Sequence, residues 1–239
     1  MAPTNLRPLT VYGTYFPSPN PPKVVFLLKL LGLPYNYVIK SLKDDPAVED
    51  GIKHPNFTSI NPNGRLPAIT DPNQNNIHVW ESGAILQYLT EVYDKDHRFS
   101  GKNLEERTLI NEWLAFQISG QAPMSGQIMW FSHPQGHTAK YGAQAPDHIL
   151  MRFKNEVDRI YGVLNTQLEK QKAKGSGWIV TDRMTIVDLA WAPWAGLMTV
   201  APAPHPEFFD GFPEVKAWLA RMDEVPAVKA AIAELKAPQ

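Results

Sequence analysis

The sequence predicts an α/β domain followed by an all-α domain, on three observations. Short runs with strand-like alternation occur in the first 80 residues, around a segment with helical spacing. A polar stretch from Asp94 to Asn103 then interrupts this pattern and is typical of a linker. Beyond the linker the sequence contains helical segments and no strand pattern. We therefore expect a small α/β domain over residues 1–94 and an all-helical domain over residues 104–239.

In the first domain the expected order is strand, helix, strand, a long loop, then two strands and a helix. Strands are expected over Leu9–Tyr12, Tyr35–Ile39, Leu66–Thr70 and Ile77–Trp80. Pro22 suits the first turn of a helix and Gly32 suits a helix end, which predicts a helix over about residues 23–31. Residues 44–63 are rich in turn-forming types and are expected to be irregular, and a second helix should cover residues 81–93.

The second domain is expected to contain four helical segments with breaks. They cover residues 104–121, 148–174, 185–199 and 212–235. The run Thr185-Ile186-Val187-Asp188 resembles a capping box. In such a box the Thr185 hydroxyl accepts a hydrogen bond from the amide of the third helical residue, and the Asp188 carboxylate reaches back to Thr185.

Composition and charge exclude several classes of function. The chain of 239 residues has no cysteine, which excludes disulfides, thiolate metal sites and a cysteine nucleophile. A formal net charge of −1 gives no support for a nucleic-acid or membrane partner. His133 and His137 are separated by a proline and a glycine, so they share no helix face and no metal site is expected. Phosphate-binding loops and serine-hydrolase elbows have no motif in the sequence.

The amino-terminal residues give no indication of secretion. They lack a basic flank followed by an apolar run, and no apolar run reaches the about 18 residues that span a bilayer. The expected location is therefore the cytoplasm.

Three segments of the first domain are candidates for a binding site. Arg65-Leu66-Pro67 fits either a plain edge strand or a cis-proline turn that frees backbone groups for a peptide-like ligand. Glu81-Ser82 lies where a strand becomes a helix, so the pair is either a helix cap or a site for both charges of an amino acid. The loop after the first strand carries the hydrogen-bond donors Tyr15, Ser18 and Asn20, in a composition that also suits a simple turn.

In combination, these segments resemble the glutathione transferase family. The stretches that carry the resemblance are Asn61–Ile69, Trp80–Leu86 and Thr185–Ala190, and the match runs from about Leu9 to Leu235. Within the family the chain is most similar to the fungal class named after the prion-forming nitrogen regulator of yeast. The residues that resemble this class are Pro19-Asn20 followed by Lys23-Val24, and the segment Ser119–Gln127. The long Asn/Gln-rich tail of the regulator is absent from the sequence, which favours the enzymatic members.

The resemblance implies a thioredoxin-like first domain that binds glutathione as co-substrate. Glu81 and Ser82 would hold the γ-glutamyl ammonium and carboxylate, and Leu66, before a cis Pro67, would pair with the cysteinyl unit. Arg65, with Lys53 or His54, would face the glycine carboxylate. Asn20 would lie near the sulfur, with Ser18 and Tyr15 as rival activating groups.

The resemblance also implies the reaction. Glutathione would be conjugated to small hydrophobic electrophiles, as in detoxification, by a homodimer. The apolar substrate would contact Met124, Gln127, Trp130, Phe131 and Trp194. The alternatives are a glutathione-dependent peroxidase or isomerase, a C–S bond-forming step in fungal secondary metabolism, and a non-catalytic glutathione-binding regulatory protein.

Overall fold

The computed structural model describes residues 6–200 and 207–236, which form two compact units. The first unit consists of the chain up to Ser100 together with the C-terminal segment that begins at Val225. The second unit comprises Gly101–Glu224. The chain therefore divides within the stretch that was expected to be a linker. Residues 1–5, which were considered for a secretory signal, and residues 237–239 lie outside the described residues. They form the outer ends of the two expected domains.

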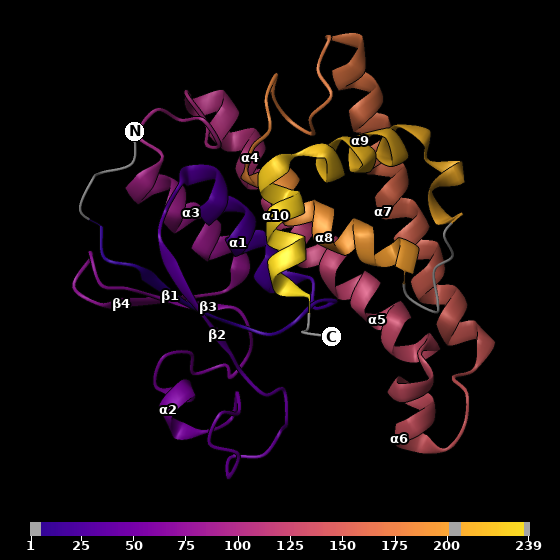
Figure 1. Ribbon diagram of the computed structural model, residues 1–239. Coiled ribbons are helices and arrows are strands. Elements are labelled where there is room, and N and C mark those ends of the chain that lie inside the picture. Colours follow the sequence, from indigo (N-terminus) through magenta and orange to yellow (C-terminus); the bar gives the residue numbers. More distant parts are fainter. Residues whose placement is uncertain (1–5, 201–206, 237–239) are drawn as a thin grey trace. The chain divides into compact units, whose positions relative to one another are not determined.

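A four-stranded sheet with the order β2-β1-β3-β4 forms the centre of the first unit (Figure 1). Its strands are β1 (Leu9–Gly13), β2 (Tyr35–Ile39), β3 (Ala68–Asp71) and β4 (Ile77–Trp80). β1 and β2 are parallel, whereas β3 is antiparallel to both β1 and β4. The predicted strand–helix–strand unit followed by a hairpin is confirmed. β3 begins two residues later than predicted, and Pro67, which has no N–H to donate, precedes it.

Two long helices of the first unit, α1 (Asn20–Leu31) and α3 (Ser82–Tyr93), pack beside each other (Figure 1). The helix α1 has prolines in its first turn and ends at Gly32, whose φ of 69° is left-handed. Its predicted apolar face is buried, as are Ile85, Leu86 and Leu89 on α3. The helix α1 is in fact buried around most of its circumference, because α10 (Pro226–Leu235) also packs against it.

The last helix, α10, belongs to the first unit and not to a domain spanning residues 104–239 as expected. The Phe16 N–H donates to the Leu235 carbonyl oxygen over 2.8 Å. Glu234 accepts a hydrogen bond from the Tyr35 hydroxyl at 2.8 Å and forms an ion pair with Lys29 at 2.6 Å. These partners are about 200 residues apart in the sequence, a separation at which periodicity carries no information.

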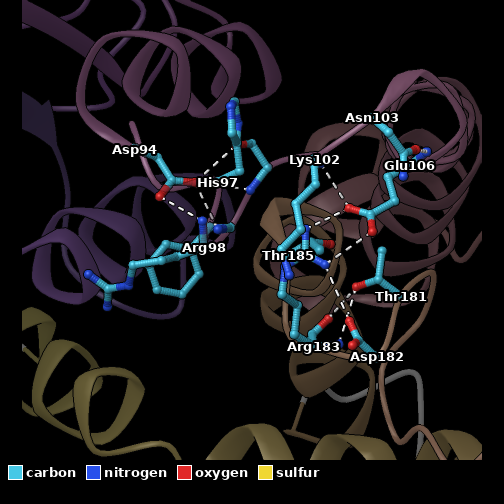
Figure 2. Close-up of polar contacts among 12 residues, drawn as sticks. Asp94, His97, Arg98, Lys102, Asn103, Glu106, Thr181, Asp182, Arg183 and Thr185 are labelled. Atoms are coloured by element: carbon cyan, nitrogen blue, oxygen red, sulfur yellow. Dashed lines mark hydrogen bonds and ion pairs between the residues drawn. The ribbon is translucent and has the colours of Figure 1, made fainter.

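The expected linker begins with an ordered turn after α3. The buried Asp94 carboxylate accepts hydrogen bonds from the backbone N–H groups of Arg98, Phe99 and Ser100 and from the Ser100 hydroxyl (Figure 2). The distances lie between 2.8 and 3.1 Å. Because the Asp94 carboxylate accepts from four donors, it holds the backbone in place as far as Ser100, where the N-terminal part of the first unit ends.

In the described residues of the second unit, the regular structure is helical. Its α-helices are α4 (Leu104–Phe116), α5 (Ala122–Ser132), α6 (Ala139–Tyr141), α7 (Asp147–Ala173), α8 (Ile186–Val200) and α9 (Pro213–Glu224). A π-helical turn, Gln117–Gln121, joins α4 to α5. The expected segments left residues 122–147 unassigned, so their pattern did not predict α5, whose Pro123 lies in the first turn, where proline is tolerated. Across the described residues, none of the helices combines the length and apolar character that crossing a bilayer requires.

Two polar clusters fix the start of α4 and of α8 within the second unit. The Arg183 guanidinium forms an ion pair with Glu106 at 2.7 Å (Figure 2). Asp188 is fully buried, and its carboxylate accepts the Thr185 N–H at 2.8 Å, as the capping box predicts. The Thr185 hydroxyl, however, accepts from the N–H of Val187 at 3.3 Å and not from the third helical residue.

Candidate functional site

The first unit contains a cavity of about 340 Å³ between its loops and the N-terminal ends of α1 and α3. Seven of the residues that line it were candidates from the sequence, namely Ser18, Asn20, Arg65, Leu66, Pro67, Glu81 and Ser82. The other lining residues are Leu42, Ile52, Asn61 and Asn63. The three candidate segments therefore meet around one space, although they are separated by up to about 60 residues in the sequence.

One wall of the cavity is the loop between β1 and α1. Asn20 is the first residue of α1, so its side chain projects from a helix N-terminus. The Tyr37 hydroxyl donates to the Thr14 carbonyl oxygen at 2.8 Å and holds the start of the loop. Tyr15 does not belong to the lining and is 37% exposed. Of the three predicted activating groups, Ser18 and Asn20 face the cavity.

A second wall is the turn that leads into β3. The Leu66–Pro67 peptide bond is cis, which confirms the cis-proline turn and excludes the plain edge strand. Asn61, which is 1% exposed, shapes this turn by donating to the Arg65 carbonyl oxygen at 2.8 Å and accepting the Asn63 N–H at 3.0 Å. Sequence reasoning did not assign a role to Asn61 or Asn63, because asparagines next to proline and glycine also suit an ordinary turn.

The third wall is the junction between β4 and α3. Glu81 precedes α3 with φ 70° and ψ 117°, a backbone conformation that is rare for a residue with a side chain. Ser82 follows as the first residue of the helix and is 8% exposed. The junction therefore presents a carboxylate, a hydroxyl and the amides of a helix N-terminus to the same cavity. Such a set can bind the ammonium and the carboxylate of one amino-acid group.

Lys23 contacts this junction, and the sequence did not indicate it as part of the site. Its ammonium nitrogen donates to the Ser82 hydroxyl oxygen at 3.3 Å, and the residue is 1% exposed. Burial lowers the pKa of Lys23 to about 7, and the negative charge of Glu81 partly offsets that effect. The feature of the sequence that could have indicated this buried lysine is its position as the single charged residue in the run Pro21–Leu28.

Lys53 and His54 do not line the cavity. The Lys53 ammonium donates to the carbonyl oxygens of Asn63 and Gly64, at 3.3 and 3.2 Å. The His54 ring accepts the Asn56 N–H at 3.3 Å and caps α2 (Pro55–Thr58), a short helix in the stretch expected to be irregular. Both side chains thus support the loops around the cavity.

The residues predicted to contact an apolar substrate lie in the second unit. Met124, Gln127, Trp130 and Phe131 are on α5, and Trp194 is on α8. The Trp194 ring packs against Gly126 of α5. The rings of Trp130 and Phe131, whose centroids are 4.8 Å apart, belong to an aromatic cluster with His137, Tyr141 and Phe153. The structure therefore groups Trp130 and Phe131 with one another and brings Trp194 to a different part of α5.

Comparison with known proteins identifies the family. Residues 17–92 match the glutathione S-transferase N-terminal domain, and residues 128–226 match the C-terminal domain. The glutathione S-transferase-like protein tpcF of Aspergillus fumigatus is 38% identical over 97% of both chains. The transcriptional regulator URE2 of Saccharomyces cerevisiae is 31% identical over 88% of this chain and 64% of its own length.

Solved structures agree with the sequence relatives. The glutathione transferase URE2P6 of Phanerochaete chrysosporium, crystallised with oxidized glutathione, has a TM-score of 0.80 and 33% identity, and the match covers 95% of each chain. Ure2p in complex with glutathione has a TM-score of 0.79 and 32% identity over 96% of this chain. The predicted similarity to the fungal class and the predicted fold are confirmed. This chain belongs to the glutathione S-transferase family.

Proposed function

We propose that the chain is a glutathione transferase that binds glutathione in the cavity of the first unit and attacks small hydrophobic electrophiles with its sulfur. The observation that carries the proposal is the convergence of Asn20, the Arg65–Pro67 turn and the Glu81-Ser82 junction on one cavity. A volume of about 340 Å³ lies within the range of small-molecule sites. Structures of relatives with glutathione bound support glutathione as the co-substrate.

The γ-glutamyl unit would be recognised at the Glu81-Ser82 junction. Its ammonium pairs with the Glu81 carboxylate, and its carboxylate accepts from the Ser82 hydroxyl and from amides at the start of α3. The left-handed backbone of Glu81 supports this role, because such conformations concentrate where a binding site requires them.

The rest of the tripeptide would follow the second wall. The backbone of Leu66 pairs with the cysteinyl unit, and Arg65 binds the glycine carboxylate. Lys53 is the weaker candidate for this carboxylate, because its ammonium already donates to two backbone carbonyl oxygens. The His54 ring is likewise used as a helix cap.

Asn20 would stabilise the thiolate. Lowering a thiol pKa from about 8.5 by about two units requires about 2.7 kcal/mol of preferential stabilisation of the anion. One hydrogen bond to a charged group contributes about 1.5–3 kcal/mol, so the Asn20 amide and the N-terminus of α1 together suffice. A protein base is not needed. Ser18 is the rival because it also lines the cavity.

The second substrate would be an apolar electrophile that contacts Met124, Gln127 and Trp194, with Trp130 and Phe131 extending the surface. Other reactions of the same bound thiolate are the reduction of organic hydroperoxides, an isomerisation and a dedicated C–S bond-forming step in fungal secondary metabolism. Assays with a chlorodinitroarene and with cumene hydroperoxide distinguish conjugation from the reduction of hydroperoxides.

We also propose a cytoplasmic homodimer, which sedimentation would detect as twice the chain mass of 26.8 kDa.

A regulatory protein that binds glutathione without turnover is the second candidate function. The observation that favours it is the 31% identity to a protein named as a transcriptional regulator. Glutathione binding without turnover of either test substrate would contradict conjugation of general electrophiles and peroxidase activity, and would favour the regulatory protein or the dedicated biosynthetic step.

Replacing Ser82 with alanine is expected to raise the Kd for glutathione about 10-fold to 100-fold, because one hydrogen bond to a carboxylate is lost. Calorimetric titration measures the change. Ser59→Ala is the matched control, since Ser59 is an exposed serine of the same unit and lies outside the cavity. An unchanged Kd in Ser82→Ala, or an equal rise in both variants, would contradict the γ-glutamyl assignment.

A further inference from the structure

The Lys23 ammonium lies one hydroxyl group away from the cavity. Its nitrogen is 3.3 Å from the Ser82 oxygen, and Ser82 lines the cavity. An ammonium can only donate, so the Ser82 oxygen is the acceptor of this bond. The hydroxyl hydrogen of Ser82 is then left to point away from Lys23, where it can donate to an anion in the cavity.

Several carboxylates lie on the elements around α1, and two of them are engaged by other side chains. The N-terminal junction of α3 contributes Glu81, whose charge acts on Lys23, and α3 itself carries Glu91 near its other end. The neighbouring α10 carries Lys229 and Glu234, and Glu234 is engaged by Lys29 and Tyr35. The β3 carboxylate, Asp71, accepts from the hydroxyls of Tyr88 and Tyr93.

The charge of Glu81 favours the positive charge on Lys23 in the ligand-free site. In the proposed complex the ligand ammonium neutralises Glu81, while the ligand carboxylate is placed on Ser82. The neutralisation of Glu81 disfavours the positive charge on Lys23, whereas the ligand carboxylate favours it. The carboxylate is separated from the Lys23 nitrogen by a single hydrogen-bonded oxygen, so its effect should be the larger.

We propose that Lys23 is a positioning residue for the γ-glutamyl carboxylate, and that binding of this carboxylate to Ser82 is coupled to the uptake of a proton by Lys23. The inference rests on the proposed glutathione site. In the reaction a neutral amine gains a proton from solvent and becomes an ammonium, and no other bond changes. Glutathione affinity then depends on pH near neutrality through a residue that does not touch the sulfur.

Calorimetric titration with S-methylglutathione tests the coupling, because this ligand has no thiol that could release a proton. Between about pH 6.5 and about pH 8 its carboxylates stay ionised, and its amine stays largely protonated because the adjacent α-carboxylate stabilises the ammonium. With a free-site pKa of about 7 for Lys23, the Kd is expected to rise roughly fivefold from about pH 7 to about pH 8. Titrations in buffers of different ionisation enthalpy should detect the matching uptake of protons.

Substitutions of Lys23 separate a titrating charge from a structural contact. Lys23→Arg keeps the positive charge throughout this pH range, so its Kd should not depend on pH. Lys23→Met removes the charge, which should give a Kd raised about tenfold at about pH 6.5 and no dependence on pH. Lys29→Met is the matched control on the same helix and should keep the dependence of the wild type. Circular dichroism checks that each variant is folded.

The outcomes distinguish this inference from the proposed function. A flat Kd in the wild type, proton release on binding, or an unchanged slope in Lys23→Arg would overturn the coupling. These results decide the matter even if Lys23→Met does not fold. If the wild type fails to bind S-methylglutathione at any pH in the range, the proposed glutathione site itself is contradicted.

Discussion

Replacing Asp188 with alanine is expected to lower the free energy of unfolding by about 4 kcal/mol. The carboxylate accepts the backbone N–H groups of Thr185 and Ile179, at 2.8 and 3.1 Å, and the Trp218 indole N–H at 3.0 Å. Asp188 and Trp218 are fully buried. Alanine would leave three donors without an acceptor where water has little access, and each such donor costs about 1–3 kcal/mol.

Chemical denaturation followed by intrinsic tryptophan fluorescence and circular dichroism measures this loss. Asp182→Ala is the matched control, because the Asp182 side chain is 83% exposed and lies a few residues away. The control should change the unfolding free energy by less than about 0.5 kcal/mol. A loss below about 1 kcal/mol in Asp188→Ala would mean that the three donors find other partners.

The same carboxylate predicts a dependence of stability on pH. Burial raises the pKa of Asp188 to about 6, above its unfolded value of 3.8. Between these values the folded state binds more protons than the unfolded state, so the contribution of Asp188 falls as the pH rises from about 4 to about 6. The difference in unfolding free energy between the wild type and Asp188→Asn should shrink over this range, by about 3 kcal/mol at most.

Replacing Asn20 with alanine is expected to lower kcat/KM for a chlorodinitroarene about 10-fold to 100-fold, because the amide proposed to stabilise the thiolate is lost. The pKa of the glutathione thiol in the complex should rise by about one to two units, because the N-terminus of α1 remains. The ultraviolet absorbance of the thiolate, followed as the complex is titrated with base, measures this pKa directly. The pH–rate profile should shift upward by the same amount.

Two variants of the same cavity control for the Asn20 prediction. Asn63→Ala removes an amide from another wall, and Ser18→Ala removes the rival donor from the same loop. The thiol pKa should stay nearly constant in both. A shift in Ser18→Ala with none in Asn20→Ala would transfer the role to Ser18, and a constant pKa in both would leave the backbone amides of α1 as the stabilising groups.

The sequence predicted the first unit well because local patterns determine most of it. Strand alternation identified the sheet, and prolines with Gly32 marked the ends of α1. The place of α10 was not predictable, because it depends on contacts with Tyr35, Lys29 and Phe16, which lie far away in the sequence. Periodicity shows which face of a helix is apolar, but not which apolar surface it covers.

The residues of the candidate site were likewise only partly predictable from the sequence. Glu81, Ser82 and Asn20 could be recognised because each lies at a point where a strand or loop becomes a helix. Lys23 and Asn61 could not, since their importance comes from burial, and burial follows from packing in three dimensions. The two residues illustrate what a sequence pattern omits, namely the buried groups that contact the residues lining the cavity.

A crystal structure of the protein grown with glutathione tests the proposed glutathione site most directly. We expect glutathione to occupy the cavity of the first unit, with its γ-glutamyl carboxylate on Ser82 and its sulfur within hydrogen-bond reach of Asn20. An empty cavity at saturating glutathione, or glutathione bound only at another surface, would contradict the proposed site.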